Sequence, residues 1–110
     1  VDEMIYEARR HGLRLILLWF GTWKNGMSSY APAWVKRDFR RFPRVKIHDG
    51  QLVEILSTFS TETRDADARA FAELMRHLKT IDGDDHTVIM VQVQNEVGVL
   101  GDSRDRSPIA

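Results

Sequence analysis

The residues best suited to chemistry lie in one short stretch near the end of the chain, Thr87-Val-Ile-Met-Val-Gln-Val-Gln-Asn-Glu-Val-Gly98. It reads as an apolar strand that is followed directly by Asn95 and Glu96. A carboxyl group at the end of a parallel strand can exchange protons with a substrate, because barrel enzymes have their active sites at that end of the sheet. The pattern therefore indicates Glu96 as a catalytic acid/base and Asn95 as a neighbour that contacts the substrate.

Alternation along this strand divides its side chains between two faces. One face carries Val91, Val93 and Asn95, and the other becomes polar towards its end, with Met90, Gln92, Gln94 and Glu96. A polar ladder of this kind suits the upper part of a barrel interior. It suits an exposed edge strand with solvated side chains equally well, because short strand patterns are weakly diagnostic.

A second set of candidate residues follows the other apolar strand and comprises Thr22, Trp23, Lys24 and Asn25. A tryptophan in a loop is costly to leave in water unless it packs or binds something. Sugar rings offer apolar faces to aromatic side chains and hydroxyl groups to Asn, Lys and Thr. We therefore predict that this loop binds carbohydrate, whereas Trp34 is expected to pack the loop against the fold.

The helices and strands that position these residues can be predicted from the spacing of apolar residues and from glycine and proline, which end or begin them. We expect a helix over 2–11 that ends at Gly12, a strand over 13–20, a helix over 63–81 with Asp65 and Asp67 in its first turn, and a strand from Thr87. Residues 21–59 read as irregular, with a short helix beginning at Pro32 and a small hairpin turning at Asp49-Gly50.

Two apolar strands joined through a helix imply parallel pairing with a right-handed crossover. Two parallel strands leave open edges and an uncovered face, so they do not complete a domain. The predicted fold class is therefore α/β, as a partial (β/α)8 TIM barrel with two parallel strands and their connecting helices. A whole barrel takes about 250 residues, so residues 1–110 are expected to be a fragment whose ends are not natural termini.

Composition narrows the classes of protein further. The chain has 110 residues, of which 43% are apolar and 29% charged, and its formal net charge is zero. Disorder is therefore not expected, and a general polyanion binder is disfavoured. The absence of cysteine excludes a disulfide framework and a thiolate zinc site, and the four histidines lack metal-ligand spacing. No cofactor and no metal are therefore expected. No membrane span is expected either, since the longest apolar run covers only 15–20.

Three motifs together resemble glycoside hydrolase family 35, over roughly residues 5–106. They are Gly21-Thr-Trp-Lys-Asn-Gly26, Ala31-Pro-Ala-Trp34 and Val91-Gln-Val-Gln-Asn-Glu-Val-Gly98. The resemblance is to the region between the third and fourth barrel strands of these retaining β-galactosidases. It implies that Glu96 is the acid/base and that Asn95 contacts the sugar 2-hydroxyl. It also implies removal of terminal β-galactosyl residues from oligo- or polysaccharides, in a periplasmic or extracellular setting.

Two positions depart from the family pattern. Many members have glutamate where this chain has Thr22, and many have glutamate where it has Gln94. Galactose is the expected sugar, and another β-linked sugar is the alternative. A related endo-β-glucanase-like enzyme is a further alternative.

A retaining mechanism needs a second carboxylate about 5–5.5 Å from the first. By the resemblance, this nucleophile follows a later strand that the chain does not reach, so the fragment alone is expected to be inactive. The other carboxylates are expected to sit in loops or on solvated helix faces, without a catalytic role, for example Glu54, Glu62, Glu73, Asp102 and Asp105.

A basic segment offers a hypothesis from a different class, a module that binds nucleic acid or another polyanion. Its cations are interleaved with aromatic residues: Lys36, Arg37, Arg40, Arg41, Arg44 and Lys46 with Trp34, Phe39 and Phe42. Asp38 interrupts the run, and a solvated loop explains such clusters more often. The expected partners are therefore a carbohydrate substrate and the remainder of the barrel, without nucleic acid or membrane.

Overall fold

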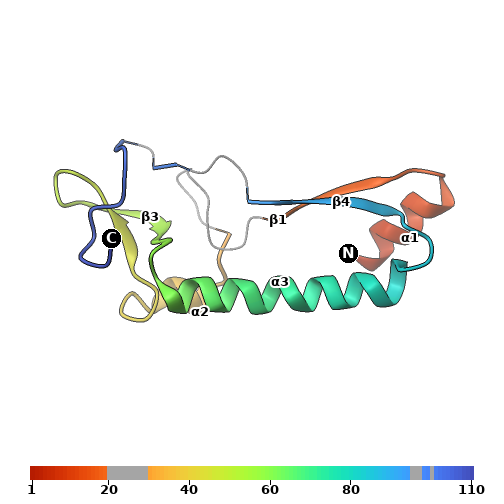
Figure 1. The fold of residues 1–110 in the computed structure, drawn as a ribbon, viewed down its shortest axis with the longest axis horizontal. Coiled ribbons are helices and arrows are strands. Elements are labelled where there is room, and N and C mark those ends of the chain that lie inside the picture. The colour runs from red at the N-terminus through yellow and green to blue at the C-terminus, as the bar shows by residue number, and fades with distance from the viewer. Residues whose placement is uncertain (20–29, 95–97, 100) are drawn as a thin grey trace.

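The computed structural model describes residues 1–19, 30–94, 98–99 and 101–110. Along the chain the elements are α1 (Asp2–Arg10), β1 (Leu15–Trp19), α2 (Ala33–Arg37), β2 (Arg44–Lys46), β3 (Leu52–Leu56), α3 (Thr61–Asp82) and β4 (Val88–Val93). The fold is mixed α/β, as the sequence predicts. The described residues form two two-stranded sheets at opposite ends of the long helix α3 (Figure 1).

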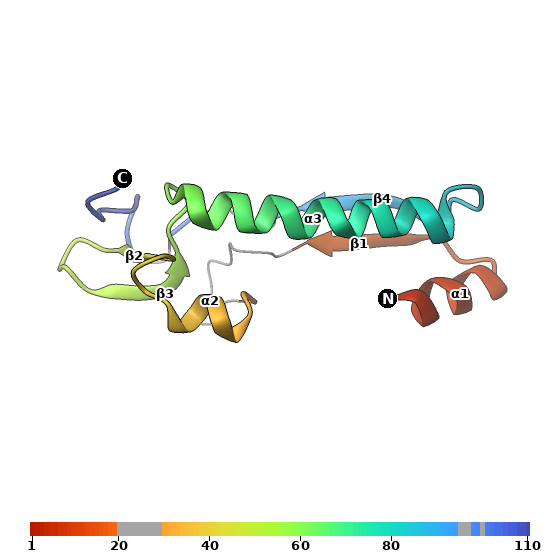
Figure 2. The same cartoon turned by 90° about the horizontal axis from the view of Figure 1, so that it is seen from below.

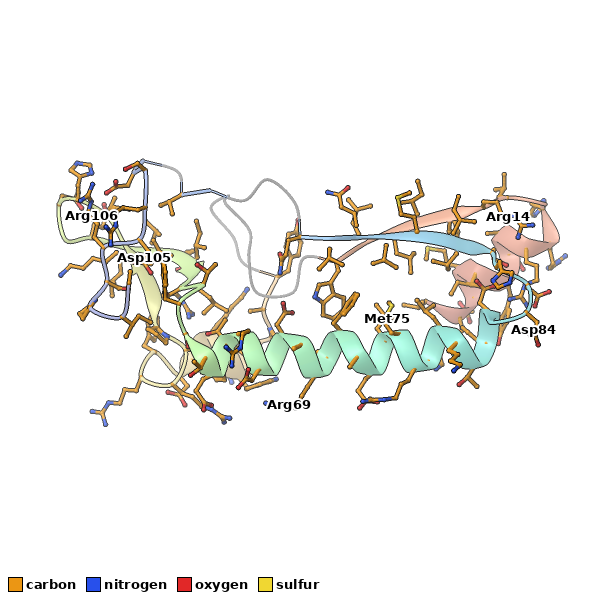
Figure 3. All side chains as sticks on the ribbon, in the orientation of Figure 1. Arg14, Arg69, Met75, Asp84, Asp105 and Arg106 are labelled. Atoms are coloured by element: carbon orange, nitrogen blue, oxygen red, sulfur yellow. The ribbon has the colours of Figure 1, made fainter. Side chains whose placement is uncertain are left out.

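The larger sheet pairs β1 with β4 in parallel, which confirms the predicted pairing. Leu17 lies opposite Val91, and Trp19 lies opposite Val93, after a register shift near Leu15. Helix α3 runs beside the two strands, and Met75 points from it towards them while Arg69 points away (Figure 3). The connection from β1 to β4 thus includes a helix that covers one face of the sheet, as in a βα repeat.

Helix α3 begins earlier than its sequence pattern indicates. Ser60 is the N-cap residue, and its hydroxyl accepts a hydrogen bond from the Thr63 backbone N–H at 3.2 Å. The helix therefore starts at Thr61, and its first turn holds Glu62. The prediction that Asp65 and Asp67 lie in the first turn is wrong, and this shift places Asp67 where it faces the sheet.

The other end of α3 is tied to α1 and to the start of β4 by the buried carboxylate of Asp82. It accepts hydrogen bonds from the backbone N–H groups of Thr87 and Val88 and from the Arg9 guanidinium, at 3.0, 2.7 and 2.7 Å. Helix α1 buries Ile5 and Ala8. Its C-terminal stop is confirmed at Gly12, whose φ of 67° lies in the left-handed region.

The smaller sheet is the predicted hairpin. Strands β2 and β3 pair antiparallel around Asp49-Gly50, where Gly50 has a φ of 85°. Its inner residues Val45 and Ile55 are fully or almost fully buried. A second small core lies where α2 packs on the hairpin, and it comprises Ala31, Val35, Phe42 and Leu56. The predicted short helix begins one residue later than expected, because Pro32 is the N-cap of α2 and Ala33 is its first helical residue.

The C-terminal segment is fastened to this hairpin by Asp105. Its carboxylate accepts hydrogen bonds from the Lys46 backbone N–H, the Ser57 hydroxyl and both the backbone N–H and hydroxyl of Ser107. Asp105 is buried, and the side chain of Asp102 is 4% exposed beside Arg106. Both residues lie outside helices and strands, as expected, and neighbouring donors compensate for the desolvation of their carboxylates. The same expectation is wrong for Glu54, which lies in strand β3.

The face of the parallel sheet opposite α3 is bare in the chain alone. Ile16, Leu18 and Met90 are 53%, 51% and 57% exposed there. The molecule is elongated, with extents of 52 × 23 × 19 Å and a radius of gyration of 16.6 Å. A compact domain of this length has a radius of gyration of about 13 Å. Figure 2, which views the molecule from the side of α3, shows α1 and α2 near opposite ends of that helix.

Candidate functional site

The predicted catalytic and sugar-binding residues lie outside the part of the chain that the structure describes. This holds for Glu96 and Asn95, and for the loop residues Thr22, Trp23, Lys24 and Asn25. What the structure describes is the scaffold from which their two segments continue, namely the C-terminal edge of β1 and β4.

At the C-terminal ends of β1 and β4, the last described residues before the two predicted segments are hydrogen-bonded to each other. The backbone N–H of Gln94 donates to the carbonyl oxygen of Trp19 at 2.9 Å. Trp19 precedes the loop with the predicted sugar-binding residues, and Gln94 immediately precedes Asn95. The two stretches that the sequence singles out therefore continue from one edge of one parallel sheet.

The Asp67 carboxylate on α3 braces this edge. One oxygen accepts a hydrogen bond from the Trp19 indole nitrogen at 3.0 Å, and the other accepts from the Gln94 amide nitrogen at 3.2 Å. The Trp19 ring also meets Phe71 edge to face, with ring centroids 5.5 Å apart. Three elements are thus held together directly below the ends of the two strands.

Gln94 does not continue the polar ladder that alternation predicts. Its side chain reaches Asp67 on α3, whereas Met90 lies on the exposed face of the sheet. The cause is the backbone of Gln94, which has a φ of 64° after the last residue of β4. A left-handed residue breaks the strand alternation, so the prediction that Gln94 shares a face with Gln92 is wrong.

A cavity of about 700 Å³ opens beside this brace, between the first half of α3 and the C-terminal segment. Its lining combines aromatic rings with polar groups, including Trp19, Phe59, Phe71, Asp67, Gln94 and Arg104. Two buried polar atoms nearby, Thr63 Oγ1 and Gln94 Oε1, have no hydrogen-bond partner among the described residues. An unsatisfied buried group costs about 1–3 kcal/mol, and neither atom is itself exposed to the cavity.

The two buried carboxylates Asp82 and Asp105 are held in the ionised form by hydrogen bonds. Burial alone would raise the pKa of Asp105, but the hydrogen bonds from Ser57, Lys46 and Ser107 outweigh it and lower the pKa. Hydrogen bonds from Val88, Thr87 and Arg9 likewise outweigh burial and hold the pKa of Asp82 well below its usual range. A general acid needs a raised pKa, so neither carboxylate is suited to that task.

Sequence reasoning missed Asp67 as the brace of this edge, although a signal for it exists. Asp67 and Phe71 are four residues apart on the side of α3 that faces the sheet. A carboxylate on the apolar stripe of a helix is expected to have a buried hydrogen-bonding partner. The indole nitrogen of Trp19 is that partner.

Within the described ranges, no cluster of three or more histidine or acidic side chains is placed to hold a metal ion. None of the helices in those ranges is long and apolar enough to cross a bilayer. The comparisons with known proteins give no family: no protein-family model and no curated protein matches this chain.

Proposed function

We propose that this chain is part of the catalytic (β/α)8 barrel of a retaining glycoside hydrolase, a β-galactosidase-like enzyme in which Glu96 is the general acid/base. The observation that carries the proposal is the shared sheet edge. The segment with Trp23, Lys24 and Asn25 and the segment with Asn95 and Glu96 continue from hydrogen-bonded neighbours, Trp19 and Gln94. Barrel enzymes collect their active-site residues at this end of parallel strands.

The uncovered surfaces of the sheet support the larger fold. Helix α3 covers one face, while Ile16, Leu18 and Met90 leave an apolar opposite face in water. Parallel sheets are normally covered on both sides. In a barrel, the face opposite the helices is the interior, where side chains from the other strands would cover these three residues.

The roles follow from the retaining mechanism. Glu96 protonates the leaving oxygen in the first step, and its carboxylate then takes a proton from the attacking water. Asn95 hydrogen bonds to the sugar, and Trp23 stacks on its apolar face. The nucleophile belongs to a part of the barrel beyond this chain, so the 110-residue piece has no activity of its own.

The test uses the full-length parent protein and an aryl β-galactoside with a good leaving group. Glu96→Gln is expected to slow the turnover of the glycosyl-enzyme, and azide is expected to restore it with a β-galactosyl azide product. Glu73→Gln is the matched control, since Glu73 is exposed on α3, where it pairs with the neighbouring Arg76. Wild-type activity in Glu96→Gln would refute the assignment, whereas an inert wild-type enzyme would refute galactose as the sugar.

A further inference from the structure

The segment 34–46 concentrates positive charge in a chain that is neutral as a whole. It carries six cations and one carboxylate. We define its basic-aromatic surface as Trp34, Lys36, Arg37, Phe39 and Arg40, which belong to α2 and the loop that follows it.

Two of the six cations are already engaged in the fold. Arg41 pairs with Glu62 at 2.7 Å. Arg44 is buried and donates to the carbonyl oxygens of Phe42 and Lys36, both at 2.9 Å. By contrast, Lys36, Arg37 and Arg40 form no ion pair with any carboxylate of the described residues. Their charges are therefore available to an anionic partner.

The two aromatic rings of this surface are fixed on buried residues and yet remain exposed. Trp34 is 58% exposed and packs edge to face on Phe42, with ring centroids 5.5 Å apart. Phe39 is 57% exposed and lies under the Arg44 guanidinium, 4.6 Å from its ring centroid. Trp34 thus contacts Phe42 but is not buried by it, whereas a tryptophan that only packs a loop against the fold would be largely buried. The Arg44 guanidinium also donates a hydrogen bond to the Phe42 carbonyl oxygen, so the supports of the Trp34 and Phe39 rings belong to one cluster.

We propose that the basic-aromatic surface binds a polysaccharide whose sugars carry carboxylates. Exposed rings stack on the apolar faces of sugars, and the free cations pair with the uronate groups. The inference rests on the proposed function, because it supplies a second contact to the polymer that carries the scissile sugar.

The proposed function, which acts on sugars, is the ground for a polyuronate rather than a nucleic acid, and Asp38 fits a sugar polymer through hydrogen bonding alone. Its exposed carboxylate lies between the cations in the sequence, where its Oδ1 accepts the Arg41 backbone N–H at 3.0 Å. A carboxylate at this position repels phosphates and uronate groups alike, so its charge does not separate the two polymers. The same oxygen atoms accept hydrogen bonds from sugar hydroxyls, which a uronate polymer offers at every residue.

The test measures binding of the full-length parent protein to de-esterified polygalacturonate by affinity gel electrophoresis. Retarded migration at low salt is expected, and Arg37→Ala/Arg40→Ala is expected to weaken binding about tenfold, because two exposed charge pairs are lost. Arg69→Ala/Lys79→Ala is the matched control, since it removes two exposed cations from α3. Trp34→Ala tests stacking, with circular dichroism as a check on folding.

Unchanged binding in Arg37→Ala/Arg40→Ala would overturn the proposal. So would tighter binding of a mixed-sequence single-stranded DNA oligonucleotide than of polygalacturonate, which would assign the surface to nucleic acid. The result is separable from the glycosidase assignment, because Glu96→Gln is expected to bind polygalacturonate as wild type does. Binding that depends on Arg37 and Arg40 in a protein inert on glycosides would support the surface and refute the enzyme.

Discussion

Trp19 and Asp67 are 48 positions apart in the sequence, yet the indole nitrogen of Trp19 donates to the Asp67 carboxylate at 3.0 Å. The bond connects the end of β1 to the second turn of α3. Because the other carboxylate oxygen holds Gln94, a single acidic side chain aligns both strand ends from which the predicted active-site segments continue.

The first prediction concerns this brace. Asp67→Ala leaves the indole and amide donors unpaired in a partly buried setting, and is expected to destabilise the protein by about 1–3 kcal/mol. Asp67→Asn is expected to cost less, because its amide oxygen still accepts from Trp19 and the Gln94 amide can rotate to accept from the new amide group. Urea unfolding followed by tryptophan fluorescence measures both. Equal losses in the two variants would contradict the role of the hydrogen bonds.

The second prediction concerns the attachment of the C-terminal segment. Asp105→Ala removes the acceptor shared by Lys46, Ser57 and Ser107, so the segment 101–110 is expected to become sensitive to limited proteolysis. The free energy of unfolding is expected to fall by about 1–3 kcal/mol, since buried donors lose their partner. Asp49→Ala is the control, because that carboxylate is exposed and accepts a local hydrogen bond from the Gln51 backbone N–H. Equal cleavage rates in the two variants would argue against this attachment.

The third prediction concerns acid stability. The pKa of Asp82 is lowered in the folded protein, so its stabilisation is complete above the unfolded pKa of about 3.9 and is lost as the pH falls towards the folded value. Wild type is therefore expected to lose more stability than Asp82→Asn when the pH falls from about 5 to about 2.5, a range that brackets the unfolded pKa of aspartate. Urea midpoints across this range measure the difference. Parallel pH profiles would show that Asp82 does not contribute.

The fourth prediction concerns the stop of α1. Gly12→Ala places a β-carbon at a φ of 67°, where it meets no atom within 4 Å, so its cost is backbone strain alone, about 1 kcal/mol. Gly12→Asn is expected to cost less, because asparagine tolerates the left-handed region. Thermal unfolding of the two variants distinguishes strain from packing. An alanine variant as stable as wild type would contradict this account.

The fifth prediction separates the chain from its proposed parent. Leu18→Lys is expected to be nearly neutral in the 110-residue chain, where Leu18 is half exposed. In the full-length protein it is expected to prevent folding, because an unpaired charge would then enter a barrel interior. Arg69→Ala on the outer side of α3 is the control, and soluble yield with thermal unfolding is the measurement. A stable full-length Leu18→Lys protein would show that this face stays in water.

Local signals predicted most of the fold. Gly12 and Asp49-Gly50 identified a helix end and a hairpin turn, and the apolar runs identified the two strands and their parallel pairing. The errors arose where tertiary contacts decide. Ser60 caps α3 earlier than the charge pattern indicates, and Gln94 leaves the strand with a positive φ. The burial of Asp105 among donors from three separate segments had no signal in the sequence. Periodicity carries no information about such long-range hydrogen bonds. The catalytic assignment of Glu96 stays a prediction.

The parallel pairing of β1 with β4 also determines the order in which the chain can fold. Leu15 must meet Val88, so a long loop closes before the first contact of this sheet forms, whereas the β2–β3 hairpin needs only its own turn. During synthesis, the hairpin is complete before β4, the partner of β1 within this chain, has been made. The apolar run 15–19 is therefore the part of the nascent chain most in need of protection against association with other chains.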